Sequence, residues 1–282
     1  YIPSIGLIII AVWGGSECLS AFCFRKRLIS HIFLASIVFC LFVLTNVQVR
    51  TWRSTLALFE HAVSVTENNG FAHHNYGYAL MEAGRLAEAK QQFEQALSLR
   101  PDYDAFYNSL GVALMRMKRY EEAILPLEHA LQLNPRYRDA RYNLGMAYAA
   151  IGNRKQAATH FAYGLKDEPQ NIKLLMALGM VLTNDNELNA AMVLYRKVSD
   201  IDPCHAGAYH NIGMICLRQG RTDDAIRYFS QALSCEQRFA SAHYHLAEAL
   251  KRKGMDEEAR RHSAEALRIN PRMKTFDAKD GF

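Results

Sequence analysis

A period of 34 residues, repeated six times between residues 70 and 273, constrains the fold of this chain more than any other sequence feature. In each unit a small residue is followed by an alanine twelve residues later, and in all but the fifth unit by a proline twelve residues after that. The small residues are Gly77, Gly111, Gly145, Gly179, Gly213 and Ala247, the alanines Ala89, Ala123, Ala157, Ala191, Ala225 and Ala259, and the prolines Pro101, Pro135, Pro169, Pro203 and Pro271. Because six copies in phase are very improbable by chance, the chain is predicted to be built from one repeating supersecondary unit.

The chemistry of the repeated positions indicates a pair of helices in each unit. The glycine and the alanine let two helices approach closely, and the proline ends the second helix because it cannot continue one. Large residues fill the space between them: Tyr76, Leu110, Leu144, Leu178, Ile212 and Leu246 on the first helix, and Phe93, Leu127, Phe161, Tyr195 and Phe229 on the second. Each pair leaves an apolar face that only the next pair covers, so the units are expected to stack into a superhelix.

This pattern resembles the tetratricopeptide-repeat (TPR) family, whose period is 34 residues. The resemblance implies an all-α fold, a right-handed superhelix of six helix-turn-helix units. The predicted units span residues 70–103, 104–137, 138–171, 172–205, 206–239 and 240–273. Residues 50–69 are expected to form a linking helix, with Phe59 and Ala62 in phase, and residues 274–282 a tail that is disordered or a brief cap.

Residues 1–49 are of a different class, because they are almost uniformly apolar. Residues 28–49 carry no permanent charge and, at about 22 residues, are long enough to cross a hydrocarbon core. Residues 2–24 form a second candidate span, and Arg25 to Arg27 form a basic turn between the two. We therefore expect a transmembrane hairpin in the bilayer. Since the chain opens at Tyr1 inside an apolar run, the hairpin is expected to end a longer membrane domain.

The basic turn also predicts an orientation. Positive turns tend to remain in the cytoplasm, so the repeats would lie outside it. The sequence thus predicts an integral protein of a bacterial inner membrane or an ER membrane, with an extracytoplasmic repeat domain.

The TPR resemblance implies that the first helix of each unit lines a concave groove, which binds protein or peptide partners. The inward positions hold Asn75, Asn143, Asn211, His74, Tyr142, His210, Tyr78 and Tyr244, together with Met146, Met180 and Met214. The three asparagines resemble half of the asparagine ladder in nucleocytoplasmic O-GlcNAc transferases, where amides hold the backbone of an extended peptide. An amide suits this role because it both donates and accepts. Ordinary consensus asparagines that make local helix contacts, and aromatic and methionine side chains that only pack, are the alternatives.

The order of the parts carries a second resemblance. A Tyr1–Gly6 opening, two spans around a basic turn, Thr51 and Trp52, and then the Asn68–Asn75 stretch resemble the junction in the transmembrane and TPR-containing O-mannosyltransferases and their bacterial relatives. This implies the substrate-recruiting arm of a C-type membrane glycosyltransferase. Its catalytic residues and any lipid-linked sugar would belong to the part upstream of Tyr1. The alternative is a membrane-tethered adaptor, without enzymatic activity, for assembly of an envelope complex.

The repeats contain no motif for catalysis, cofactor binding or metal binding. No nucleophile–base pair or phosphate loop occurs, so the sequence assigns no catalytic or cofactor-binding residue and no cofactor. Histidine pairs at the i, i+4 spacing of helical metal sites are lacking, so no metal ligand is assigned. The net charge of +5 comes without a basic stripe, which argues against nucleic acid as a partner. The six cysteines show no framework spacing and are interpreted as small apolar residues in helices.

Overall fold

The computed structural model describes residues 24–51 and 54–273. Within these residues there are fourteen helices and no strand. The first two are α2 (Phe24–Thr51) and α3 (Thr55–Val65). The repeats follow as pairs: α4 (Gly70–Glu82) with α5 (Leu86–Leu99), α6 (Asp104–Arg116) with α7 (Tyr120–Leu133), α8 (Arg138–Ala150) with α9 (Arg154–Asp167), α10 (Ile172–Asn184) with α11 (Leu188–Ile201), α12 (Ala206–Arg218) with α13 (Thr222–Cys235), and α14 (Ala240–Arg252) with α15 (Asp256–Ile269). The even-numbered helices from α4 to α14 are called A helices below, and the odd-numbered helices from α5 to α15 are called B helices.

The repeated glycine brings each A helix directly onto a large side chain of its B helix. A Cβ atom added at Gly145 would lie 2.6 Å from Cε1 of Phe161, a distance that real Cβ atoms do not adopt. The same holds at four other crossings, where the partners are Gly77 and Phe93, Gly111 and Leu127, Gly179 and Tyr195, and Gly213 and Phe229. The large partners are fully buried. The prediction that the repeated glycine lets the two helices approach closely is thus confirmed.

The turn inside each unit needs a residue in the left-handed backbone region. Gly84, for example, has φ of 77°, and the backbone N–H of Arg85 donates to the carbonyl of Leu80 at 2.9 Å. This arrangement closes the end of an A helix and reverses the chain. The second and fourth units use Lys118 and Asn186 with φ of 61° and 63° in place of glycine.

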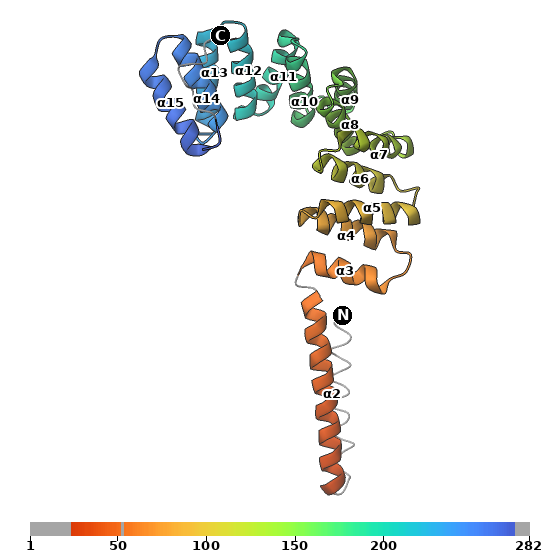
Figure 1. Cartoon of the computed structure of the whole chain (residues 1–282). Coiled ribbons are helices and arrows are strands. Elements are labelled where there is room, and N and C mark those ends of the chain that lie inside the picture. The colour runs from red at the N-terminus through yellow and green to blue at the C-terminus, as the bar shows by residue number, and fades with distance from the viewer. Residues whose placement is uncertain (1–23, 52–53, 274–282) are drawn as a thin grey trace.

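Neighbouring units stack side by side into the curved row seen in Figure 1. Each B helix packs against the next A helix along the chain. The A helices of successive units also touch, as α4 does α6, α6 does α8, α8 does α10 and α12 does α14, whereas no two successive B helices of the described chain touch to this extent. The A helices therefore lie on the inner side of the superhelix. The pair α10 and α12 is less closely packed than the other A-helix neighbours.

Two helices precede the repeats. α3 begins after Ser54, whose hydroxyl oxygen accepts from the backbone N–H of Ala57 at 3.1 Å, and it packs on α4. A single helix is what the sequence predicts there. α2 extends away from the stack (Figure 1), and its main contact with the described chain is α3.

The predicted membrane hairpin is not seen in the described residues. Residues 2–23 of the first span lie outside the described residues, and Arg25 to Arg27 belong to α2, so the prediction that they form a turn is wrong. The second span coincides with a helix, and its Ile32, Phe33 and Phe39 side chains are exposed. Nevertheless, among the residues that could be searched, no helix combines the length and apolar character needed to cross a bilayer. Two transmembrane helices are thus not supported.

Candidate functional site

All eight predicted groove residues lie on A helices, which form the inner side of the stack. They come from four helices, with Asn75, His74 and Tyr78 on α4, Asn143 and Tyr142 on α8, Asn211 and His210 on α12, and Tyr244 on α14. None of them is fully buried. The structure therefore places them on one face, but gathers them into separate clusters along it.

The first cluster lies between α4 and α6. The His74 Nε2 atom is 2.9 Å from the Ser109 hydroxyl, which is itself 3.1 Å from the Tyr78 hydroxyl. The His74 ring stacks on Phe106 with centroids 4.5 Å apart. Burial lowers the pKa of His74 to about 4, so the ring is neutral at pH 7. His74 thus serves as a neutral, hydrogen-bonded ring in an aromatic contact between two units.

The asparagines make contacts within the protein. The Asn143 side-chain amide donates to Oδ1 of Asn108 at 2.9 Å, and Asn108 in turn donates to the Tyr137 hydroxyl at 3.4 Å. Asn108, which the sequence analysis did not single out, is one of two buried polar residues in the described chain. Asn143 therefore links one unit to the preceding one, through a contact between α8 and α6 and not one local to its own helix. Its contact with a ligand remains a prediction.

A second ring cluster joins α12 to α14. His210 lies 5.3 Å from the ring of His245 and 5.1 Å from that of Phe239. Burial, reinforced by the charge of His245 when protonated, lowers the pKa of His210 to about 4. Tyr244 meets His245 edge to face at 5.1 Å. The His210 ring, like that of His74, is thus packed between two units, whereas Tyr244 contacts its neighbour on the same helix.

An opening on the inner side lies between α8, α10 and α12. It is a hollow of about 620 Å³, and Tyr142 and Asn211 from the predicted set lie on its wall. The other lining residues are Met146, Ile172, Lys173, Met176, Ala177, Met180 and His205. Of these, the sequence analysis named only Met146 and Met180. Met176 could have been found, because it occupies in the fourth unit the position of His74, Tyr142 and His210 in theirs.

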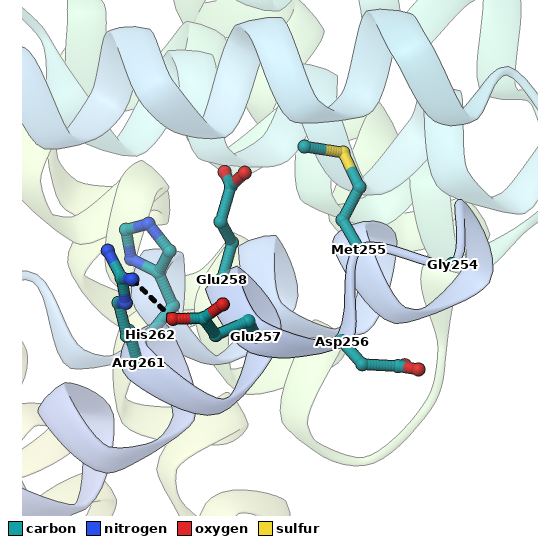
Figure 2. Close-up of a pocket in the computed structure, with 7 residues that line it drawn as sticks. All are labelled: Gly254, Met255, Asp256, Glu257, Glu258, Arg261 and His262. Carbon is teal, nitrogen blue, oxygen red and sulfur yellow. Dashed lines mark hydrogen bonds and ion pairs between the residues drawn. The ribbon is translucent and has the colours of Figure 1, made fainter.

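A different hollow, of about 610 Å³, lies at the beginning of α15 (Figure 2). Its lining comes from a single chain segment between Gly254 and His262, and Arg261 pairs with Glu257 along α15 at 2.6 Å. None of the predicted groove residues belongs to it. Across the described residues, no cluster of three or more histidine, cysteine or acidic side chains is arranged to hold a metal ion.

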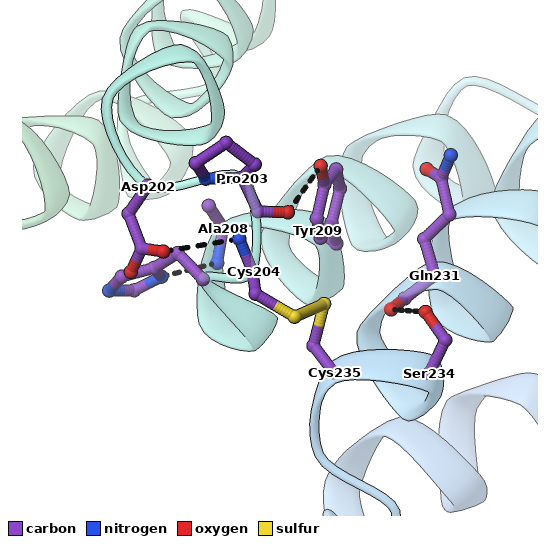
Figure 3. Close-up of a disulfide and its surroundings, with 9 residues drawn as sticks. Asp202, Pro203, Cys204, Ala208, Tyr209, Gln231, Ser234 and Cys235 are labelled. Atoms are coloured by element: carbon purple, nitrogen blue, oxygen red, sulfur yellow. Dashed lines mark hydrogen bonds between the residues drawn. A yellow bond between two sulfur atoms is a disulfide. The ribbon is translucent and has the colours of Figure 1, made fainter.

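Cys204 and Cys235 form a disulfide, so the interpretation of all six cysteines as apolar helix residues is wrong for this pair (Figure 3). Their Cα atoms are 5.2 Å apart, within the usual range for a disulfide. Cys204 lies just before α12, and Cys235 is the last residue of α13. Because the two helices run antiparallel, the end of the B helix returns to the start of the A helix. The bond thus joins the segment just before α12 to the end of α13, beside His205 of the hollow.

Solved structures give the broadest comparison. Over 77% of this chain and 43% of the other, Cut9–Hcn1 of the APC/C superposes with a TM-score of 0.64 at 18% identity. YrrB matches 65% of this chain and 95% of its own at 22% identity, TM-score 0.55. MamA from Desulfovibrio magneticus matches 61% of this chain and 97% of its own at 19% identity, TM-score 0.57. At these identities the likeness shows the fold alone. No curated protein matches the chain.

The repeats themselves match models of one family. Four models described as tetratricopeptide repeats match residues 76–137, 139–167, 206–238 and 240–273, which together make more than half of the chain. None of the comparisons gives evidence for a relationship to O-mannosyltransferases. With the 34-residue period, the stacked helix pairs and these matches in agreement, the chain belongs to the tetratricopeptide-repeat family.

Proposed function

We propose that the chain is a scaffold that binds extended peptides or protein segments along its inner side. The observation that carries this is the hollow between α8, α10 and α12, where apolar walls meet the polar side chains of Asn211 and Lys173. Such a mixture of apolar surface and a few placed polar groups is typical of binding sites. YrrB, similar in fold, is a TPR protein with an unusual peptide-binding site. The proposal itself rests on this chain's own lining residues.

A peptide-binding assay on the full chain tests the proposal. A pool of fluorescein-labelled nine-residue peptides of random sequence should raise the fluorescence anisotropy on addition of the protein. The double variant Asn143→Ala with Asn211→Ala should weaken binding, because each amide can hold a peptide backbone. The matched control is Gln95→Ala with Gln231→Ala, two exposed amides on the B helices α5 and α13. Equal binding by both double variants would assign the two asparagines to packing alone, and absence of binding to the parent would overturn the proposal.

A second candidate concerns where the scaffold works. We propose that residues 1–49 attach it to a membrane and that the repeats lie outside the cytoplasm, as the recruiting arm of a C-type glycosyltransferase. Two observations support the placement. The Cys204–Cys235 disulfide is of a kind that persists in oxidising compartments, and α2 exposes Ile32, Phe33 and Phe39 with no described partner covering them. A tethered adaptor without enzymatic activity fits the same two observations.

Reporter fusions after Phe282 test the placement. Alkaline phosphatase should be active and a cytosolic fluorescent protein dark, because the phosphatase acquires its own disulfides only outside the cytoplasm. A bright fluorescent fusion with an inactive phosphatase would reverse the orientation. The choice between enzyme arm and adaptor rests on the sequence upstream of Tyr1. Several further spans with an acidic first loop favour the enzyme, and a start codon directly before Tyr1 favours the adaptor.

A further inference from the structure

One wall of the hollow between α8, α10 and α12 carries a small side chain, that of Ala177. Ala177 occupies the position held by asparagine in the first, third and fifth units. Gly207 of α12 faces Met176, and a Cβ atom added to Gly207 would lie 3.6 Å from the Met176 Cε atom. The hollow thus lies where the fourth unit has alanine in place of asparagine and where α10 and α12 are less closely packed than the other A-helix neighbours.

The walls of the hollow are apolar and adaptable. Three methionines, Met146, Met176 and Met180, line it together with Ile172. Met180 is 41% exposed, so its thioether meets solvent in the absence of a partner. Methionine side chains have three rotatable bonds and reshape around an apolar guest, which is why they recur in surfaces that bind apolar side chains.

One edge of the hollow is positively charged. The Lys173 ammonium lies 4.0 Å from the centroid of the Tyr142 ring, and no carboxylate of the described residues pairs with it. The residues that line the hollow include no aspartate or glutamate. An acidic group on a bound segment would therefore find a cation next to the apolar walls. On the α12 side Asn211 lines the hollow, and its Oδ1 atom lies 3.3 Å from Nδ1 of His210. An amide can both donate and accept, so its remaining hydrogen-bonding capacity can serve a peptide backbone.

We propose that this hollow selects an extended peptide in which a leucine- or methionine-sized side chain is followed by an acidic residue. The aliphatic side chain fills the space between the methionines, and the carboxylate pairs with Lys173. The inference rests on the proposed function and names the segment that the scaffold prefers. The other stretches of the inner side add contacts that depend little on peptide sequence.

Four labelled peptides and the full chain test this preference. The reference peptide has nine residues of serine, glycine and threonine, with a central leucine followed by glutamate. Replacing its leucine by serine should weaken binding about tenfold, the effect of losing one buried aliphatic side chain. Replacing its glutamate by lysine should weaken binding about two- to fivefold, as expected for one exposed ion pair. The fourth peptide carries both changes.

Two variants locate the preference. Met180→Glu should remove the advantage of leucine over serine, whereas Val193→Glu should keep it, because Val193 is exposed on α11, the B helix of the same unit. Lys173→Glu should reverse the charge preference, so that the lysine peptide binds more tightly than the glutamate peptide. Reversal of a preference cannot result from misfolding.

The outcomes separate this inference from the broader one. Equal affinity of the parent for all four peptides would overturn the leucine-acid preference and leave the scaffold in place. Binding of none of them, nor of the random pool, would overturn both. If both variants kept the parent's preference for leucine and glutamate, the peptide would bind at another part of the inner side, and the proposed site would be overturned.

Discussion

At the residue scale, the repeated glycines act by lacking a side chain at one particular contact. Gly145→Ala should lower the free energy of unfolding by about 1 kcal/mol or more, because the new methyl group overlaps the fully buried Phe161 ring. Helix propensity alone would act the other way, by about 1 kcal/mol. Urea unfolding followed by circular dichroism measures the difference.

Gly207→Ala is the matched control, because the added Cβ atom there meets only the ends of the His205 and Met176 side chains. It should leave stability unchanged or raise it by up to about 1 kcal/mol. If both variants changed the free energy of unfolding by the same amount and in the same direction, the close helix contact would not be the reason for glycine at the repeated position.

The buried histidines predict a dependence of stability on pH. The pKa values of His74 and His210 are lowered from 6.5 to about 4, so the unfolded chain takes up their protons first as the pH falls. Their contribution is therefore fully present above pH 6.5 and is lost progressively between 6.5 and 4. We expect the urea midpoint to be lower at pH 5 than at pH 7. His74→Gln combined with His210→Gln should reduce that difference.

His61→Gln, an exposed position on α3, is the control for this experiment and should leave the difference unchanged. The hydrogen bond with His245 lowers the pKa of Glu248, so this carboxylate loses its stabilising form below the usual range of a glutamate. Measurements at pH 5 and above keep the histidine effect separate. An unchanged difference in the double variant would show that other groups control the acid response.

At the element scale, the disulfide should stabilise the fifth unit. It joins residues 31 apart in sequence, and closing a loop of that size is worth roughly 3–4 kcal/mol through the entropy of the unfolded chain. Cys235→Ser should therefore lower the melting temperature, and reductant should lower that of the parent but not of the variant. Cys40→Ser, at an exposed cysteine on α2, should change neither. A parent that melts alike with and without reductant would contradict the disulfide.

The helices could be predicted from the sequence because each is encoded by residues close together. The period gives the pairing of A and B helices, and the proline gives the end of most units. The disulfide was missed because Cys204 and Cys235 lie in neighbouring units of the linear pattern. The pairing could have been found from the antiparallel geometry of the unit, because the end of a B helix returns to the start of its own A helix. The turn at Arg25 to Arg27 was predicted from three basic residues between two apolar runs, but such residues do not interrupt a helix, and all three belong to α2.

At the scale of the whole molecule, the inner side could be assigned from the repeat, but its open site could not. The position within the unit correctly placed Tyr142 and Asn211 on A helices, where they line the hollow. His74 and His210 hold the same position in their units as Tyr142, yet their rings are packed against the next unit. Whether a position is open depends on how closely two A helices approach. That distance is set by contacts between two units, such as α10 and α12, which the pattern of a single unit does not contain.

The stacked architecture predicts that removing a helix at one end destabilises mainly the units next to it. In a repeat protein each unit contacts only its neighbours, so stability is the sum of unit and interface contributions. α3 packs on α4, where Leu56 reaches the core cluster of the first three units, and α3 has no fully buried residue of its own. Residues 70–273 should therefore remain helical, monomeric and in solution without detergent, but be less stable than residues 54–273 by about 1–2 kcal/mol, the value of one partly buried aliphatic contact surface.

Hydrogen exchange of the two fragments shows where that loss falls. The amides of α4 and α5 should exchange faster in the shorter fragment, because their outer face has lost its cover, while those of α12 to α15 should be unchanged. The Cys204–Cys235 bond links the start of α12 to the end of α13, so it should further slow amide exchange at the C-terminal end of the stack. Faster exchange spread evenly from α4 to α15 would mean that the six units unfold as one cooperative body. Their stability would then be a property of the whole superhelix rather than of neighbouring pairs.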